Sequence, residues 1–213
     1  MGSIRAFMAS WLALSLLCLV QPAQAGKYNR KLNIGDAAPS WSDVTGIDGK
    51  QHALADLKAA KAVVVVFTCN HCPIATAYEE RLKQLQTDFR DRGVQVVAVS
   101  VSRSEEDTLE LLQARARERE FNFLYLQDLS QDLGRRYGAA VTPQALVLDG
   151  DRKVAYMGAI DDDWQHADNV GVAYVREAVE AVLAGKPPKH TETRHTGCGI
   201  EYARTPRKPD EKK

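Results

Sequence analysis

The sequence has no excess of charge of either sign, because its 213 residues contain 28 Lys and Arg and 28 Asp and Glu. This balance gives no general electrostatic reason to bind nucleic acid or an anionic membrane. The hydrophobic share of 45% and the charged share of 26% are ordinary for a globular protein. The composition therefore predicts one main domain with one sizeable core.

The sequence also lacks an apolar run long enough to be a convincing transmembrane helix. The run at residues 6–20 is shorter than the roughly 20 residues that a spanning helix needs. Arg5 precedes it, and the small-x-small sequence Ala23-Gln24-Ala25 follows it, as in a secretory signal peptide. We predict that residues 1–25 are removed and that the mature chain is exported, periplasmic or secreted, without a stable membrane span.

Cysteine is scarce, with four residues in the whole chain. Removal of the predicted signal peptide takes away Cys18 and leaves Cys69, Cys72 and Cys198. Export generally leads to an oxidising compartment, in which three cysteines cannot all pair within one chain. The odd number favours redox chemistry over a static disulfide. A four-ligand structural zinc site would need a second nearby cysteine pair, and the chain has none.

The mature chain begins with β-type patterns and then changes to a helical one. Residues 38–54 predict two short strands around Asp48-Gly49, since this pair favours the positive φ angles of a tight hairpin. Val63–Phe67 is apolar throughout, which is typical of a strand buried on both faces. An apolar stripe then predicts a helix that ends at Gly93. Its members are Tyr78, Leu82, Leu85 and Phe89.

The alternation continues through the second half of the chain. Val94–Val101 predicts a second buried strand, and Ser104 with Asp107 predicts a capping box that starts a helix through about Glu118. A short strand or extended link, a helix, two strands and a last helix are then expected in order. The short strand or link is expected at residues 121–128, the helix at 129–138, the two strands within 139–158 and the last helix at 172–185.

These elements predict an α/β architecture with one central sheet in a domain at residues 26–185. Residues 186–213 form a charged, proline-containing tail that carries Cys198. We expect this tail to be poorly ordered, except around the cysteine.

The stretch "FTCNHC" places two cysteines where the first buried strand meets a helix. If Cys69 follows the strand and Cys72 lies in the first helical turn, free backbone N–H groups and the helix dipole favour the thiolate of Cys69. His71 between them can add a positive charge or a hydrogen bond. Pro73 suits the first turn, where its missing N–H costs nothing.

With these residues the chain resembles the thioredoxin superfamily, and within it the exported redoxins of the AhpC/TSA and thiol-disulfide branches. The resemblance covers about residues 35–185 and also includes "YGAAVTPQALVLD". It implies a central mixed β-sheet flanked by helices, with an N-terminal hairpin extension. It further implies that Thr142-Pro143 occupies the position of a cis-proline that faces the active cysteines.

The resemblance implies an exported thiol-disulfide oxidoreductase that uses Cys69, His71 and Cys72 opposite Thr142 and Pro143. Its partners would be protein thiols or disulfides and a redox partner protein, with no resident cofactor. Thioredoxin itself has a tryptophan before the first cysteine and Gly-Pro between the two, unlike this chain. The intervening histidine is more similar to the oxidising and isomerising members.

Two other functions remain open at this point. A thiol peroxidase of the peroxiredoxin type has a threonine three positions before its cysteine, where this chain has Val66. The copper-delivering redoxins of cytochrome oxidase assembly use two cysteines and a distant histidine, which would here be Cys69, Cys72 and His166. The cysteine spacing is one residue shorter than in those proteins.

The three cysteines are expected to differ in their roles. We predict that Cys69 is the more exposed and more acidic thiol, so that it attacks first and Cys72 resolves the mixed disulfide. Cys198, between two flexible glycines, either resolves or stores a disulfide as an accessory redox residue, or is a tail thiol that pairs between chains or does nothing.

Overall fold

The computed structural model describes residues 26–204, so the predicted signal peptide, with Cys18, lies outside the described residues, as do residues 205–213. Among the described residues, nine strands form two sheets. They are β1 (Val44–Gly46), β2 (Gln51–His52), β3 (Ala62–Thr68), β4 (Val94–Ser100), β5 (Leu124–Gln127), β6 (Val141–Thr142), β7 (Gln144–Leu148), β8 (Val154–Gly158) and β9 (Cys198–Gly199). Seven of them make the central sheet, in the order β2-β1-β5-β4-β3-β7-β8, and β6 pairs with β9.

Within residues 26–204, five α-helices and four short 3-10 helices connect these strands. The α-helices are α1 (Pro73–Ala77), α2 (Glu79–Phe89), α3 (Leu109–Glu118), α4 (Asp132–Tyr137) and α5 (Tyr174–Leu183). The 3-10 helices are η1 (Leu54–Leu57), η2 (Arg90–Arg92), η3 (Glu105–Asp107) and η4 (Ala167–Asn169). No helix among residues 26–204 has the length and apolar character needed to cross a membrane.

The central sheet is mixed, as the sequence predicts. Strand β3 pairs parallel with β4 and antiparallel with β7, and β4 pairs parallel with β5. The predicted hairpin at Asp48-Gly49 is confirmed, with β1 and β2 antiparallel and Gly49 at a φ of 76°. Strand β1 also pairs with β5, which attaches the hairpin to the sheet.

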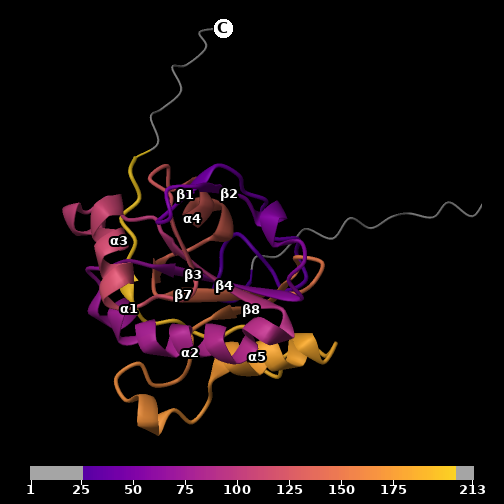
Figure 1. The fold of residues 1–213 in the computed structure, drawn as a ribbon. Helices are drawn as coiled ribbons and strands as arrows, with labels where there is room; N and C mark the ends of the chain where they lie inside the picture. The colour runs from indigo at the N-terminus through magenta and orange to yellow at the C-terminus, as the bar shows by residue number, and fades with distance from the viewer. Residues whose placement is uncertain (1–25, 205–213) are drawn as a thin grey trace, which may run out of the picture.

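Strand β3 lies in the middle of the protein, and every one of its residues is buried. Successive side chains of a strand point to opposite faces, so its apolar run serves two cores. Val64 and Val66 pack with apolar residues of α2, α3 and α5, whereas Val65 and Phe67 pack with α4 and the N-terminal segment. Figure 1 shows α2 and α5 on one side of the sheet and α4 on the other. This double burial fixes the end of β3, where the cysteines follow.

Two helical predictions need correction. The predicted helix after the cysteines is divided at Tyr78 into α1 and α2. The helix expected to begin at Ser104 begins instead after Thr108, whose hydroxyl accepts a hydrogen bond from the Leu111 N–H. Ser104 caps only the short η3. The side chain of Asp107 therefore does not complete a capping box and is free for another contact.

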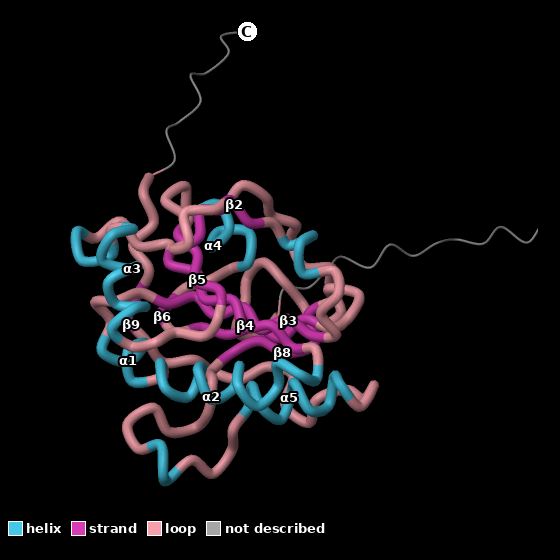
Figure 2. The backbone as a smooth tube through the Cα atoms, in the orientation of Figure 1, coloured by secondary structure: helices cyan, strands magenta, loops and turns pink. Residues whose placement is uncertain are grey.

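The C-terminal segment packs against the domain around Cys198, the part of the tail for which the sequence analysis made an exception. Strand β9 pairs with β6, and the Ile200 N–H donates to the Ala140 carbonyl oxygen. Gln131 donates to the Glu201 carbonyl oxygen (2.9 Å) and accepts from the Ala203 N–H (2.8 Å). Figure 2 shows β6 and β9 beside α1. Backbone pairing, which composition does not reveal, holds this segment in place.

Candidate active site

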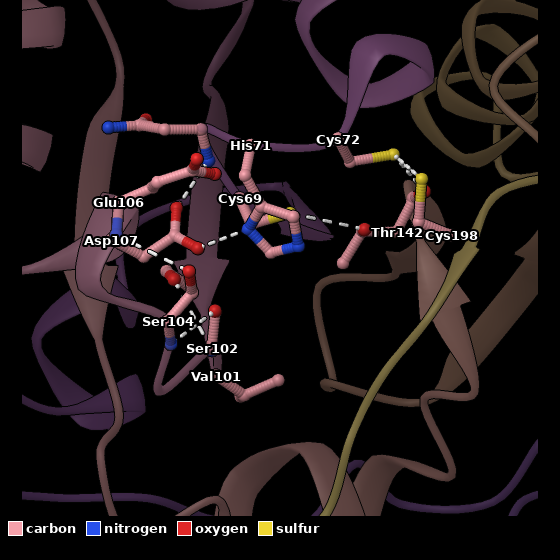
Figure 3. Close-up of polar contacts among 12 residues, drawn as sticks. Cys69, His71, Cys72, Val101, Ser102, Ser104, Glu106, Asp107, Thr142 and Cys198 are labelled. Atoms are coloured by element: carbon pink, nitrogen blue, oxygen red, sulfur yellow. Dashed lines mark hydrogen bonds and ion pairs between the residues drawn. The ribbon is translucent and has the colours of Figure 1, made fainter.

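The strand-to-helix junction places the two neighbouring cysteines differently. Cys69 directly follows β3, whereas Cys72 is the N-cap of α1 and Pro73 is its first residue. Thr142 approaches both cysteines from β6, and the Thr142–Pro143 peptide bond is cis. The structure thus brings together five of the residues named from the sequence, namely Cys69, His71, Cys72, Thr142 and Cys198 (Figure 3).

Cys69 is a buried thiol with two polar neighbours. Its Sγ lies 3.3 Å from the Thr142 hydroxyl oxygen and 3.8 Å from Nε2 of His71. Burial raises the pKa of Cys69 to about 12, although the Thr142 hydroxyl opposes the shift. The prediction that Cys69 is the more acidic thiol is therefore wrong, because its side chain is only 3% exposed and loses most of its hydration. A base must take its proton before it can attack.

The other nitrogen of His71 is held by a carboxylate that the sequence analysis did not place in the site. Nδ1 of His71 lies 2.5 Å from Oδ2 of Asp107, and the Asn70 N–H donates to Oδ1 over 2.6 Å (Figure 3). The Asp107 side chain is fully buried, while the imidazole is 34% exposed. The contact fixes the ring so that Nε2 faces Cys69. A thiol, an imidazole and a carboxylate are thus arranged in series, as a nucleophile, a base and the group that orients it.

A signal for Asp107 was present in the order of the elements. Strands β3 and β4 are parallel neighbours, so their carboxyl ends lie at the same edge of the sheet. Cys69 follows one strand and η3 follows the other, which brings a residue of η3 next to the cysteine. The Ser104-x-x-Asp107 spacing instead favoured a capping interpretation.

Cys72 lies between Thr142 and the third cysteine. Its thiol donates to the Thr142 carbonyl oxygen (3.1 Å), and its Sγ is 2.6 Å from Sγ of Cys198. Burial alone would raise the pKa of Cys72, but hydrogen bonds with Cys198, Thr142 and the Ala75 N–H leave that pKa lowered. Burial and the neighbouring Cys72 raise the pKa of Cys198 to about 11. Cys72, and not Cys69, is therefore the more acidic thiol.

A cavity of about 420 Å³ opens beside Cys69. Its walls include His71 and Thr142, the Ser102–Ser104 loop and residues 199–201 of the C-terminal segment. Cys72 and Pro143 do not line it, and Pro143 borders a smaller cavity of about 190 Å³. Within the described part of the chain, Cys69 is the cysteine that lines the larger cavity.

The structure does not bring His166 into this cluster. His166 is exposed on the loop before α5, and its ring lies 3.4 Å from an oxygen of Asp163. Within residues 26–204, the group of three potential metal ligands whose donor atoms lie within 4.8 Å of one another is Cys69, His71 and Asp107. Both oxygens of Asp107 already accept hydrogen bonds there.

Comparison with known protein families identifies residues 34–157 as a match to the AhpC/TSA family. The chain belongs to the AhpC/TSA family. The matched region contains the cysteine pair, His71, Asp107 and the Thr142–Pro143 bond of this AhpC/TSA protein. It ends before Cys198, so the C-terminal thiol lies outside the part that the family description covers. No curated protein matches the chain.

Solved structures place this AhpC/TSA protein among thioredoxin-like folds. A hypothetical protein from Sinorhizobium meliloti 1021 is 31% identical, with a TM-score of 0.75, and the match covers 82% of this chain and 97% of that one. An uncharacterized conserved protein from Geobacillus kaustophilus is also 31% identical, with a TM-score of 0.76 and coverages of 83% and 96%. A thiol:disulfide interchange protein from Chlorobium tepidum TLS, of the thioredoxin family, is 19% identical, with a TM-score of 0.55 and coverages of 71% and 98%. The likeness to the last protein shows the fold.

Proposed function

We propose that this AhpC/TSA protein is an exported thiol-disulfide oxidoreductase that exchanges disulfides with protein substrates through Cys69 and Cys72. The observation that carries the proposal is the cavity beside Cys69, where a buried thiol, a base and a hydroxyl meet. Export rests on the signal-like residues 1–25.

The first step is the removal of the proton from Cys69. Because burial raises the pKa of this thiol to about 12, few molecules carry the thiolate without help. Nε2 of His71, 3.8 Å away, is the nearest ring nitrogen and can accept the proton after a small movement. The Asp107 carboxylate then stabilises the imidazolium that forms, and the Thr142 hydroxyl can donate to the sulfur anion.

The second step is thiol-disulfide exchange in the cavity. The Cys69 thiolate attacks one sulfur of a substrate disulfide, forms a mixed disulfide and releases the other substrate sulfur as a thiolate. Cys72, whose pKa is lowered, then attacks Cys69. The Cys69–Cys72 bond forms, the mixed disulfide breaks, and the second substrate thiol leaves. The substrate gains two electrons from the two cysteines, and the same steps in reverse oxidise a substrate dithiol.

Of the two grounds expected from the sequence for Cys69 as the attacking residue, exposure and acidity, we retain exposure alone. Both cysteines are buried, and Cys72 is the more acidic. Access decides between them, because Cys69 lines the cavity and Cys72 does not. The attacking thiolate must reach the substrate sulfur, so Cys69 attacks first. Cys72, although more acidic, does not line the cavity and acts second.

A turnover assay with insulin disulfides and a dithiol donor tests this function. The wild-type chain is expected to accelerate reduction, and Cys69→Ser and Cys72→Ser are each expected to abolish the acceleration. Glu105→Gln, an exposed change on η3, is the matched control and is expected to keep it. Full activity of Cys69→Ser would contradict the proposal.

The alternative is a copper-binding redoxin, and the proximity of Cys69, His71 and Asp107 is the observation in its favour. A thiolate and an imidazole suit Cu(I), although the carboxylate is a poorer ligand for it. Titration with Cu(I) under anaerobic conditions distinguishes the alternatives. Stoichiometric binding that Cys69→Ser and His166→Ala each weaken would favour the copper function. Binding that depends on His71 but not on His166 would place the ion at the cysteine pair instead.

A further inference from the structure

The sulfur atoms of Cys72 and Cys198 lie 2.6 Å apart, although the two residues are separated by 126 positions in the chain. We propose that Cys198 is a third redox residue, which takes over the disulfide from Cys69 by forming a bond to Cys72. This inference rests on the proposed function, because the Cys69–Cys72 disulfide is its starting point. It assigns a role in catalysis to the C-terminal segment.

Backbone pairing brings the third cysteine to this place. Cys198 stands opposite Thr142 in the β6–β9 ladder, and Thr142 is also the residue that contacts Cys69 and Cys72. Hydrogen bonds to the domain also hold the residues that follow β9, at positions 201–203. The Tyr202 hydroxyl donates to the Ala139 carbonyl oxygen over 2.8 Å, and Gln131 binds the backbone further along. The position of Cys198 is therefore built into the fold.

The glycine before Cys198 is required for the close approach of the two segments. A methyl group at Gly197 would collide with the backbone carbonyl group of Thr142. A methyl group at Gly199 would meet no atom within 4 Å. The two glycines on either side of the cysteine thus differ sharply, and of these two only Gly197 is needed for the close approach of the segments.

The exchange step conserves electrons. The Cys198 thiolate attacks Sγ of Cys72 in the Cys69–Cys72 disulfide, the Cys72–Cys198 bond forms, and Cys69 leaves as a thiolate. The thiol of Cys198 loses its proton to water, and His71, protonated in the first step, returns one to Cys69. One disulfide replaces another without net oxidation. A dithiol protein, the redox partner, then reduces the Cys72–Cys198 bond with two electrons.

Oxidation of Cys72 also prepares Cys198 for this attack. In the reduced protein, burial and then the neighbouring Cys72 raise the pKa of Cys198. Once Cys72 is part of a disulfide it carries no negative charge, so one of these two causes disappears. The result is a reduced Cys69 in the cavity, while the disulfide is held behind it by Cys72 and Cys198 until the redox partner reduces it.

Mapping the disulfide in the oxidised protein tests the inference. The reduced mature chain is treated with one equivalent of diamide, quenched in acid, alkylated with N-ethylmaleimide and digested with trypsin. Cys69 and Cys72 share the fragment of residues 62–81, and Cys198 lies in that of residues 195–204. We expect the two fragments to be linked, with one alkyl group on Cys69. An unlinked fragment 62–81 with an internal disulfide, and an alkylated Cys198, would overturn the proposal.

Single-cysteine variants identify which thiol is linked and separate this inference from the proposed function. We expect Cys69→Ser to link the fragments, Cys198→Ser to form the Cys69–Cys72 bond, and Cys72→Ser to remain reduced. If Cys69→Ser stays reduced while Cys198→Ser oxidises, the relay is refuted and the oxidoreductase function stands. If Cys198→Ser stays reduced, the Cys69–Cys72 pair fails, and both proposals are refuted.

The two glycines supply a geometric test in the Cys69→Ser background. Gly197→Ala must displace Cys198, and a misplacement of about 1 Å can slow a positioned reaction on the order of 10²-fold. Gly199→Ala is the matched control and should form the disulfide at the parent rate. Equal rates in the two variants would contradict the geometry on which the relay depends. If Gly197→Ala does not fold, the mapping of the wild-type chain still decides.

Discussion

Replacing Asp107 by asparagine tests whether the buried carboxylate makes His71 a base for Cys69. Asparagine has nearly the same shape, and its side-chain oxygen can still accept from the Asn70 N–H. Its amide group would then face Nδ1 of His71 and donate to it. The proton of a neutral ring would move to Nε2, which would point a donor at Cys69 and leave no acceptor for the thiol proton.

The size of the effect follows from the contact that is lost. A hydrogen bond to a charged group contributes about 1.5–3 kcal/mol, and each 1.4 kcal/mol corresponds to about a factor of ten. The Asp107–His71 contact, at 2.5 Å and with a fully buried carboxylate, belongs to this class. We therefore expect Cys69 in the variant to react about 10-fold to about 150-fold more slowly near neutral pH.

Alkylation by iodoacetamide measures this reactivity. In a Cys72→Ser background, Cys69 is the one remaining thiol of the fragment at residues 62–81, so its rate can be followed by mass spectrometry. The variant should need a higher pH to reach the parent rate, which a loss of packing alone would not produce. Glu105→Gln, on the same turn but exposed, should leave the profile unchanged. A rate within about threefold of the parent would refute the role of the carboxylate.

Three further predictions follow from the site and the fold. His71→Ala should make the Cys69–Cys72 pair more reducing by about 30–60 mV, because a stabilising contact of the thiolate is lost; equilibration with glutathione measures this. Cys72→Ala should trap a mixed disulfide with a model substrate on nonreducing gels, whereas Cys69→Ala should not. Gly138→Ala should lower the free energy of unfolding by about 2–5 kcal/mol, because its φ is 67° and the methyl group would collide with a buried amide. Gly185→Ala, with a φ of 66° and open space, should cost about 1–2 kcal/mol in urea denaturation.

The fold could be predicted from local patterns because the core strands are unusually uniform. Val63–Phe67 contains apolar residues alone, and this pattern fits a strand that is buried on both faces. The stripe through Leu82, Leu85 and Phe89 likewise faces the core of the structure. Periodicity did not reveal the division of the helix at Tyr78, because the predicted apolar stripe begins at that residue and carries no information on the turn before it.

The residue patterns alone assigned roles most firmly where neighbours in sequence are also neighbours in space, and the family resemblance added the distant Thr142 and Pro143. Cys69, His71 and Cys72 met this condition, and their order along the chain was enough to name them. Asp107 and Cys198 reach the site through long-range strand pairing, which the sequence does not specify. The acidity of the two cysteines was predicted in the wrong order. The helix dipole was expected to act on Cys69, but α1 begins at Pro73, with Cys72 as its cap, and burial dominates at Cys69.

The pairing of β6 with β9 determines when, during synthesis of the chain, the third cysteine can reach the other two. Cys69 and Cys72 emerge together, and their junction with β3 can form early, whereas Cys198 follows Cys72 by 126 positions. Until β9 has been synthesised and pairs with β6, the cavity wall formed by residues 199–201 is missing and Cys198 is not yet next to Cys72. Among the three cysteines of residues 26–204, an oxidant acting on the growing chain can therefore join Cys69 and Cys72 before Cys198 is present. The finished protein is the first form in which the disulfide can have two alternative positions.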